Sequence, residues 1–355
     1  MESVSSPLVS VLTPVYNGAK YLSECIQSVL AQTYNNWEHV IVNNCSTDRS
    51  LEIAQNFAAK DRRIRVINNK KFVGLYRNHN IAVRQMSRES KYCKFVHADD
   101  WLFPECISRM VELAEEHSSV GIVSSYALEG NKVWLTGLPY PSTVVPGREI
   151  CRSSLLGGPY LFGTPTSLLF RADLVRRYET FFNESHIHSD TEACYELLQD
   201  SDFGFVHQVL TFSRVHEEQA TRFSVRLNTY LLGKLERLLQ YGPKFLTGGE
   251  YEERLKELLR RYHRFLGRRV FRANGKELRD FHLSKLAALG YPVSRYRLFR
   301  ASCLELMRLL GDTKRLMQTL RETSSNVKYR HRAQNLSEMR TKRILQLPEG
   351  KQRSL

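Results

Sequence analysis

The sequence predicts an α/β fold with a mostly parallel sheet flanked by helices, followed by a basic α-helical C-terminal region. Two observations predict it. Strand and helix signals alternate through the first 125 residues, and the charge changes abruptly near residue 222. Residues 1–222 carry 22 Lys and Arg against 25 Asp and Glu, whereas residues 223–355 carry 30 against 12. With 42% hydrophobic residues, a 355-residue chain can bury more than one core, so we expect two modules with different partners.

The predicted strands are short runs of β-branched and other apolar residues that end at turn-forming residues. They are residues 9–13, 37–42, 64–67, 94–97 and 120–125. The segments between them repeat apolar residues at helical spacing, which predicts helices at 22–30, 51–58, 74–86 and 107–114. Ser46 or Asp48 is the expected cap of the second helix. This alternation of strands and helices is typical of a doubly wound parallel sheet.

Two adjacent carboxylates, Asp99 and Asp100, follow directly on the predicted strand 94–97. Ligands of open α/β sheets bind at the carboxyl ends of the strands, and paired acidic oxygens there can hold Mg²⁺ or Mn²⁺. The structural alternative is that the pair caps the next helix, whose first turn is expected to hold Pro104 and Glu105. The sequence therefore predicts a metal site, with helix capping as the competing interpretation.

Four segments in this order carry a family resemblance: V-S-V-L-T-P-V-Y-N, V-I-V-N-N-C-S-T-D, R-N-H-N and F-V-H-A-D-D. Over residues 7–220 the chain resembles the family 2 glycosyltransferases of GT-A (Rossmann-like) fold. The resemblance implies transfer of a sugar from a nucleotide-diphosphate donor, here expected to be a UDP-sugar, with Mn²⁺ or Mg²⁺ and with inversion at the anomeric carbon. The implied acceptor is a hydroxyl of a glycan or of a lipid-linked molecule, in the synthesis of a bacterial surface polysaccharide.

The resemblance also assigns residues to the nucleoside of the donor. Pro14, Val15 and Tyr16 fall at the nucleoside pocket, with the tyrosine ring beside the base. Stacking of a base on such a ring is worth roughly 1–3 kcal/mol, although a half-buried aromatic at a strand end is the alternative. Asn43 and Asn44 stand where the family usually has two aspartates. An amide can hydrogen-bond a base but brings no negative charge.

The predicted metal ligands are Asp99, with Asp100 as support or second ligand. The family motif commonly reads Asp-x-Asp-Asp, and His97 takes its first position here. His97 is expected to contact the diphosphate or the donor ribose, or to be a hydrogen-bonded strand-end histidine. Arg77, in the Arg-Asn element, is implied to reach a phosphate, unless it is a surface arginine. His216, in an Arg-x-His element, is implied to contact the diphosphate or the metal.

The acceptor hydroxyl must lose a proton as it attacks, so a carboxylate or histidine is needed as general base. The family places an acidic residue at the start of a late helix, and Ser189-Asp190-Thr-Glu192 fits that position. Asp190 aligns best with the base, and Glu192 is the reserve candidate. Both could instead be first-turn charges that interact with the helix dipole. His186 and His188 are expected to line the same pocket.

The C-terminal third departs from the resemblance. Apolar residues at helical spacing in 227–239, 251–266, 277–289 and 295–322 predict either a small helical bundle or a set of helices laid on the catalytic domain. We expect a catalytic domain at 1–222, with a nucleotide-sugar half at about 7–125 and an acceptor half at about 126–222. A basic helical domain at 223–340 and a disordered tail at 341–355 would follow.

Basic side chains gather on the second of these helices, at 254, 256, 260, 261, 264, 268 and 269. Such a face can rest on an anionic membrane, where each basic residue adds about 1 kcal/mol, or it can be an ordinary solvated face. Nucleic acid is not an expected partner, because no recognisable binding motif accompanies the charge. A liposome-binding measurement would separate the two interpretations.

The sequence holds neither a long apolar span nor a signal-peptide pattern, and its seven cysteines are scattered without a C-x-x-C motif. We therefore expect a cytoplasmic protein, peripheral on the inner face of the membrane if the basic helices bind it. One alternative function is a non-catalytic nucleotide- or nucleic-acid-binding protein. A sugar-phosphate nucleotidyltransferase is the weaker alternative, since residues 14–18 supply no Gly-rich basic phosphate loop.

Overall fold

The structure is a computed structural model that describes residues 6–135, 137–216, 221–270 and 275–311. The chain forms two compact units. The first comprises Met1–Val225 and Gly233–Glu252, and the second comprises Arg226–Leu232 and the chain from Glu253. Part of the predicted helical domain, residues 233–252, thus belongs to the same unit as the sheet. The predicted tail at 341–355 lies outside the described residues.

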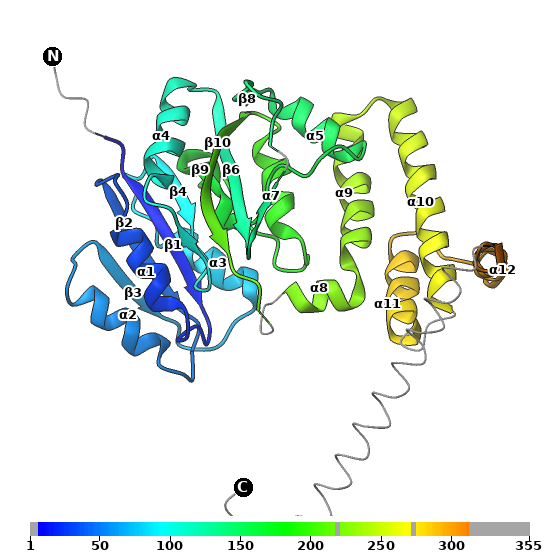
Figure 1. The fold of residues 1–355 in the computed structure, drawn as a ribbon, viewed down its shortest axis with the longest axis horizontal. Coiled ribbons are helices and arrows are strands. Elements are labelled where there is room, and N and C mark those ends of the chain that lie inside the picture. Colours follow the sequence, from blue (N-terminus) through cyan, green and yellow to red (C-terminus); the bar gives the residue numbers. More distant parts are fainter. Residues whose placement is uncertain (1–5, 136, 217–220, 271–274, 312–355) are drawn as a thin grey trace, which may run out of the picture. The chain divides into compact units, whose positions relative to one another are not determined.

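The first unit is built on one mixed sheet (Figure 1). Its spatial order is β3 (Ile64–Asn68), β2 (Trp37–Asn43), β1 (Val9–Val15), β4 (Tyr92–Phe95), β9 (Leu168–Arg171), β6 (Val120–Glu129), β10 (Asp202–Ser213) and β5 (Trp101–Leu102). Two short strands, β7 (Lys132–Trp134) and β8 (Val144–Val145), pair with β6 and β10. Strands β3, β2, β1 and β4 are parallel, whereas β9 runs antiparallel between β4 and β6. The predicted α/β class is confirmed.

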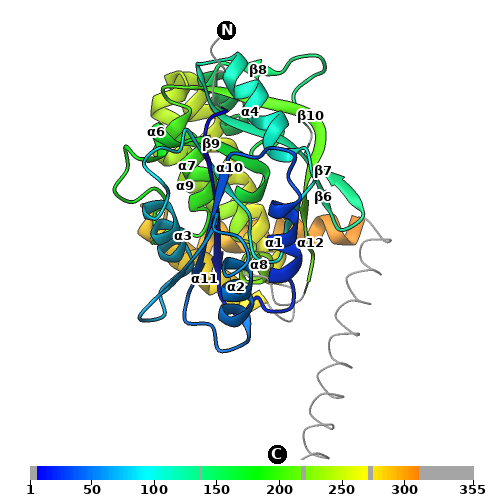
Figure 2. The same cartoon turned by 90° about the vertical axis from the view of Figure 1, so that its left-hand side faces the viewer.

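Helices cover both faces of the parallel half, as the edge-on view of Figure 2 shows for α1 and α3. On one face, α1 (Leu22–Leu30), α2 (Ser50–Ala58) and α4 (Cys106–Glu116) contribute buried side chains to one core with the strands. On the other face lies α3 (Leu75–Arg84). The buried positions of α1 are Leu22, Cys25, Ile26 and Val29, the apolar positions that the sequence repeats at helical spacing.

Along the chain, the remaining elements of this unit come between β8 and β10 or after β10. They are α5 (Gly147–Leu155), the 3₁₀ turn η1 (Pro165–Ser167), α6 (Ala172–Val175), α7 (Ser189–Leu197) and parts of α8 (Thr221–Leu227) and α9 (Thr229–Phe245). Helix α9 packs on α7: the Tyr241 ring stacks on Tyr195 with centroids 4.9 Å apart, and the Tyr241 hydroxyl donates to Glu196 Oε1 at 2.8 Å. The sheet unit therefore uses α9 to hold α7 in place.

Strand β4 begins and ends two residues earlier than the predicted strand 94–97. Its register explains the difference, because Tyr92 and Cys93 pair with Val9 and Ser10 of β1. Lys94 interrupts the apolar run in the sequence, yet its side chain is fully buried. His97 consequently lies beyond the end of β4, in the same loop as the two aspartates.

In the second unit, helices α10 (Gly248–Val270, which begins in the first unit), α11 (Gly275–Ala288) and α12 (Arg295–Gly311) match three of the predicted amphipathic segments. Polar contacts inside this unit join Tyr262 Oη to His282 Nδ1 at 2.5 Å and His282 Nε2 to the Leu227 carbonyl at 2.6 Å. Within the described ranges, none of the helices is both long and apolar enough to cross a membrane.

The basic stripe of α10 is smaller than the sequence predicted. Arg254 is only 7% exposed and pairs with Glu257. The long aliphatic part of an arginine can pack into an apolar interior while its guanidinium finds a carboxylate, which the spacing of charges in the sequence does not reveal. Among the α10 residues whose side chains the structure describes, the exposed basic ones are Lys256, Arg260, Arg261, Arg264 and Arg268, and the predicted basic position 269 lies outside this set.

Candidate functional site

A group of metal-ligating side chains lies just beyond the end of β4. Ligand atoms of His97, Asp99 and Asp100 all lie within 4.8 Å of one another. Helix α4 starts at Cys106, and the side chain that accepts a first-turn N–H is Gln32, whose Oε1 bonds Ile107 N–H at 3.0 Å. The interpretation of the two aspartates as a helix cap is therefore wrong, and the predicted grouping of carboxylates at the strand end, joined by His97, is what the geometry favours.

Asp100 is held firmly from two directions. Its side chain is 5% exposed, its Oδ2 accepts the Thr166 hydroxyl at 2.7 Å, and its Oδ1 accepts the Arg214 backbone N–H at 3.0 Å. The same Thr166 oxygen accepts the His97 backbone N–H at 3.1 Å. Burial, reinforced by the charge of Asp99, raises the pKa of Asp100. A bound cation would relieve this penalty by supplying the missing positive charge.

Asp99 is the more accessible carboxylate, with 32% of its side chain exposed. His216 Nε2 lies 2.8 Å from Asp99 Oδ2, and Arg214 Nε donates to the Asp99 carbonyl at 3.1 Å. The Arg214 guanidinium pairs with Glu24 and lies 4.3 Å from the centre of the Tyr21 ring. Arg214 and His216 of the predicted Arg-x-His element thus both contact Asp99. The contact of this element with a diphosphate stays a prediction.

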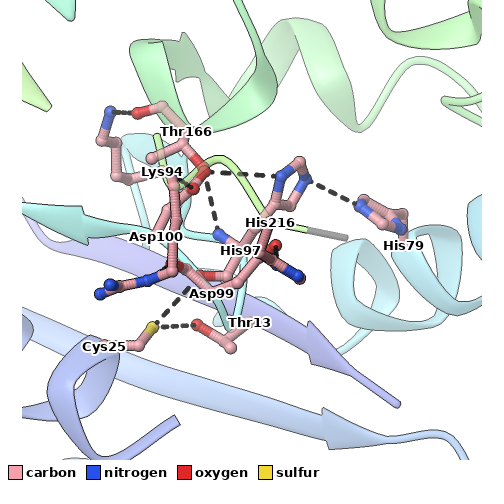
Figure 3. A network of polar contacts seen from close by, with 10 residues as sticks. Thr13, Cys25, His79, Lys94, His97, Asp99, Asp100, Thr166 and His216 are labelled. Carbon is pink, nitrogen blue, oxygen red and sulfur yellow. Dashed lines mark hydrogen bonds and ion pairs between the residues drawn. The ribbon is translucent and has the colours of Figure 1, made fainter. Parts of the chain in front are cut away.

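A buried lysine supports the turn that carries Thr166. Lys94 Nζ donates to the Thr166 carbonyl at 2.5 Å (Figure 3) and to the Leu168 carbonyl at 3.2 Å. Burial lowers the pKa of its ammonium group. The sequence placed residues 163–167 in a loop facing the donor sugar and the acceptor, but it revealed neither the role of Lys94 nor the bond from Thr166 to Asp100. Thr166 is 66 positions from Asp100, and no local pattern links them.

His97 also contacts a second histidine, His79, on the buried face of α3 (Figure 3). The two Nε2 atoms lie 3.2 Å apart, and His79 Nδ1 lies 2.9 Å from the Leu75 carbonyl oxygen. Burial lowers the pKa of His79 to about 3, so its imidazole is neutral at physiological pH. The other ring nitrogen of His97, Nδ1, lies 3.8 Å from Asp100 Oδ2.

Of the predicted nucleoside residues, only Tyr16 is exposed. Pro14 and Val15 are buried within β1, whereas Tyr16 is 50% exposed. The Tyr16 ring meets the exposed Phe72 edge to face, with centroids 4.8 Å apart. Phe72 was not predicted, although an aromatic residue after the third strand is a visible signal.

The two asparagines after β2 are buried. Asn44 donates to the Val73 carbonyl at 2.8 Å and accepts the Val73 N–H at 3.0 Å, so it fixes the loop that carries Phe72. Asn43 is 1% exposed and donates to Asn68 Oδ1 at 2.8 Å. Their predicted contact with a base stays a prediction, and this geometry favours an anchoring role. Arg77 is exposed on α3.

Both candidates for the general base lie in the first turn of α7. Asp190 Oδ1 lies 3.4 Å from the Tyr76 hydroxyl, and the Tyr76 ring lies 5.9 Å from that of His79. These contacts link Asp190 to His97 through neighbouring side chains. Glu192 is 4% exposed, and both its oxygens lie 2.8 Å from His186 Nδ1. Burial raises the pKa of Glu192.

Residues 10–179 match the family model described as glycosyl transferase family 2. These residues form a family 2 glycosyltransferase domain. Among similar proteins, an uncharacterized glycosyltransferase of Haemophilus influenzae is 28% identical over 191 residues, which cover 52% of this chain and 58% of that protein. The chain therefore spans less than two thirds of that relative. A putative teichuronic acid biosynthesis glycosyltransferase, TuaG of Bacillus subtilis, is 33% identical over 34% of this chain and 48% of its own.

Solved structures share the fold of the family 2 domain. S. aureus TarS 1–349 in complex with UDP-GlcNAc superimposes with a TM-score of 0.60 at 18% identity, over 84% of this chain and 87% of that one. The mannosyltransferase PcManGT of Pyrobaculum calidifontis, in complex with GDP-Man and Mn²⁺, gives 0.52 at 15% identity, over 89% and 84%. Both agree with the GT-A fold expected from the sequence.

The metal-ligating side chains at the end of β4 in the family 2 domain suit a divalent cation. The carboxylates of Asp99 and Asp100 and the imidazole of His97 converge at the strand end. Burial and the neighbouring charge of Asp99 disfavour the charged form of Asp100. Oxygen ligands suit Mg²⁺ and Mn²⁺, and an imidazole adds affinity for transition ions. Asp99, Asp100 and His97 are the residues that could hold it.

Proposed function

We propose that the chain is an inverting, metal-dependent glycosyltransferase that moves a sugar from a nucleotide-diphosphate donor to an acceptor hydroxyl. One observation carries the proposal: the convergence of His97, Asp99 and Asp100 at the strand end of a family 2 domain. Carboxyl ends of parallel strands are where open α/β sheets bind nucleotides. A UDP-sugar is the proposed donor, and the complex of the structural neighbour TarS with UDP-GlcNAc supports it.

The donor nucleoside is proposed to lie against Tyr16 at the end of β1. A half-exposed ring beside a second exposed ring offers an aromatic surface at the edge of the sheet. Pro14 and Val15 would support the pocket from the strand, and Asn43 and Asn44 would hold its wall. The exposed Arg77 is the proposed cation for a phosphate of the donor.

Departure of the nucleoside diphosphate needs its growing negative charge to be neutralised. A bound Mn²⁺ or Mg²⁺ supplies that neutralisation as a Lewis acid. Asp99 and Asp100 would hold the ion, with His97 completing the group. His216 keeps Asp99 oriented, and Thr166 keeps Asp100 oriented, so little reorganisation is needed during the reaction.

Asp190 is the proposed general base. It is half-buried at the start of α7 and connected to the metal group by side-chain contacts, and among the described residues no histidine forms an ion pair with it. Glu192 is the reserve candidate, but its two oxygens are engaged with His186. A direct displacement with one base inverts the anomeric configuration, which is the stereochemistry proposed here.

The proposed acceptor is a glycan or lipid-linked hydroxyl in surface polysaccharide synthesis, and the similarity to TuaG, a putative teichuronic acid biosynthesis glycosyltransferase, supports it. We place the enzyme at the cytoplasmic face of the cell membrane. Its second unit offers the exposed basic residues of α10 and the exposed apolar residues Tyr296, Phe299 and Met307 of α12. Basic and apolar side chains together suit an anionic lipid surface.

A thermal-shift series of nucleoside diphosphates and nucleotide sugars, each with and without Mn²⁺, tests the function. We expect one nucleotide to raise the Tm only when Mn²⁺ and Asp99 are both present, because ligand binding to the native state raises stability. Folded protein that responds to no nucleotide would reject the proposal. Binding without sugar transfer would instead favour the alternative of a non-catalytic nucleotide-binding protein, and salt-sensitive binding of DNA would favour a nucleic-acid-binding one.

A further inference from the structure

His79 is a buried histidine whose surroundings fix its protonation. Its side chain lies among the rings of Phe95, Phe182 and Tyr76, with centroids 5.7, 5.6 and 5.9 Å away, and the residue is 4% exposed. No carboxylate contacts it among the described residues, and the charged form would lack a counterion there. The neutral imidazole, with one ring proton, is the form that this site accommodates.

The position of that proton follows from the neighbours of the ring. His79 Nδ1 lies 2.9 Å from the Leu75 carbonyl oxygen. A carbonyl oxygen only accepts hydrogen bonds, so Nδ1 carries the proton and Nε2 is left with a lone pair. His97 Nε2 lies 3.2 Å from this lone pair. A hydrogen bond between the two nitrogens therefore requires the proton to be on Nε2 of His97.

The tautomer of His97 has a consequence at the metal group. When the single ring proton of His97 is on Nε2, Nδ1 has a free lone pair. Nδ1 is the ring nitrogen that faces Asp100, and it lies 3.8 Å from Asp100 Oδ2 (Figure 3). The opposite tautomer would point an N–H at the space where a cation binds. Ligating histidines generally donate their second ring N–H to a partner that sets the tautomer, and here that partner is an imidazole.

We propose that His79 is a positioning residue that holds His97 as its Nε2–H tautomer and thereby makes His97 Nδ1 a ligand of the metal site. The proposal rests on the proposed function only for the identity of the site. His97 would then supply a nitrogen ligand at the position where the family motif commonly has its first aspartate. Nitrogen ligands favour first-row transition ions over Mg²⁺, so the site should prefer Mn²⁺.

The tautomer can be read directly from the full chain labelled with ¹⁵N-histidine. Long-range ¹H–¹⁵N correlation spectra distinguish a protonated from a bare ring nitrogen, and loss of one set of signals in His97→Asn assigns that ring among the 11 histidines. We expect metal-free wild-type protein, at a pH where the His97 ring carries a single proton, to show that proton on Nε2 and a bare Nδ1. A spectrum with the proton on Nδ1 would overturn the proposal without any change at His79.

Two variants separate positioning from packing. His79→Phe keeps an aromatic ring but removes the acceptor, whereas His79→Gln offers an amide oxygen as a replacement acceptor. In His79→Phe we expect His97 to become a mixture of tautomers and the affinity for Mn²⁺, measured by electron paramagnetic resonance, to fall about 10- to 100-fold, the usual effect of losing such a partner. His79→Gln should restore most of both properties.

His39→Phe is the matched control, because His39 is equally buried, also has its pKa lowered to about 3, and bonds Thr13 rather than His97. It should leave the His97 spectrum and Mn²⁺ affinity unchanged. Equal losses of Mn²⁺ affinity in the two phenylalanine variants, with an unchanged His97 tautomer, would assign His79 to packing alone. Because neither readout needs nucleotide or acceptor, failure of sugar transfer would leave this test intact.

Discussion

His216 Nε2 lies 2.8 Å from Asp99 Oδ2, a contact between residues 117 positions apart. His216 follows the last strand of the sheet, and Asp99 follows β4, so the contact forms only after the whole sheet has assembled. Asp99 is the less buried of the two carboxylates and has fewer other restraints. Its orientation toward a cation therefore depends on this histidine.

Replacing His216 by Ala should weaken Mn²⁺-dependent binding of the donor nucleotide by about 10- to 100-fold, as losing a partner of a metal ligand usually does. Titration calorimetry with and without Mn²⁺ would measure the effect. His207→Ala is a suitable control, because His207 lies near the middle of β10, the strand that precedes His216, and bonds the Ser142 carbonyl. Equal losses in both variants would point to damage to the strand instead.

Asp99→Asn should abolish metal-supported sugar transfer, with activity at least about 10³-fold lower, since an amide is a poor ligand and the leaving group keeps its charge. The measurement is the release of nucleoside diphosphate as Mn²⁺ is varied. Asp173→Asn removes an exposed carboxylate that pairs with Arg171 and should have wild-type activity. Metal-dependent activity in Asp99→Asn would contradict the assignment of Asp99.

Asp190→Asn and Glu192→Gln should differ in kind. Asp190→Asn removes the proposed general base. We expect it to lower kcat by about 10²- to 10⁴-fold and to leave donor binding intact. Glu192→Gln should chiefly lower the free energy of unfolding, by roughly 1–3 kcal/mol, because it weakens a buried contact with His186. Steady-state kinetics and urea unfolding of both variants decide the matter, and the reverse result would make Glu192 the base.

Stability should fall with acidification partly because of His39. Burial lowers its pKa to about 3 in the folded protein, below the unfolded value near 6.5, so the unfolded chain binds more protons between these values. Its contribution is fully present above pH 6.5 and shrinks as the pH falls, by up to about 1.4 kcal/mol per pH unit. Asp100 opposes this trend, because its raised pKa favours the folded state on acidification.

His39→Gln removes the contribution of His39 to the pH dependence of the free energy of unfolding, since glutamine does not titrate. Urea unfolding at a series of pH values from 4.5 to 7.5 should give a shallower decline of the free energy of unfolding than in wild type. The slope is the informative quantity, because the substitution also changes the absolute stability. Parallel pH profiles would show that His39 is not held neutral in the folded state.

Binding to anionic vesicles should depend on the exposed arginines of α10. Arg260→Glu together with Arg264→Glu should weaken co-sedimentation with phosphatidylglycerol vesicles by at least about tenfold, because each basic residue near the surface contributes about 1 kcal/mol. The exposed pair Arg62→Glu and Arg88→Glu in the first unit changes the net charge equally and serves as control. If both pairs behave alike, the effect is one of net charge and no membrane face exists on α10.

The sequence by itself determined the class of fold and the position of the site along the chain. Apolar spacing located α1, β1 and β2 closely, because periodicity reflects which side of an element is buried. The pair Asp99 and Asp100 stood out because adjacent carboxylates after a buried strand need a partner. These signals are local, and a single segment of chain contains them.

Only the tertiary structure decided how the site is held together. Thr166 binds Asp100 across 66 positions, His79 on helix α3 meets His97 in the loop after β4, and Lys94 is buried against carbonyls despite its charge. It also showed that Arg254 is buried and that residues 233–252 belong with the sheet unit. Each contact joins groups whose proximity follows from the pairing of strands and the packing of helices, and no short stretch of sequence encodes that proximity.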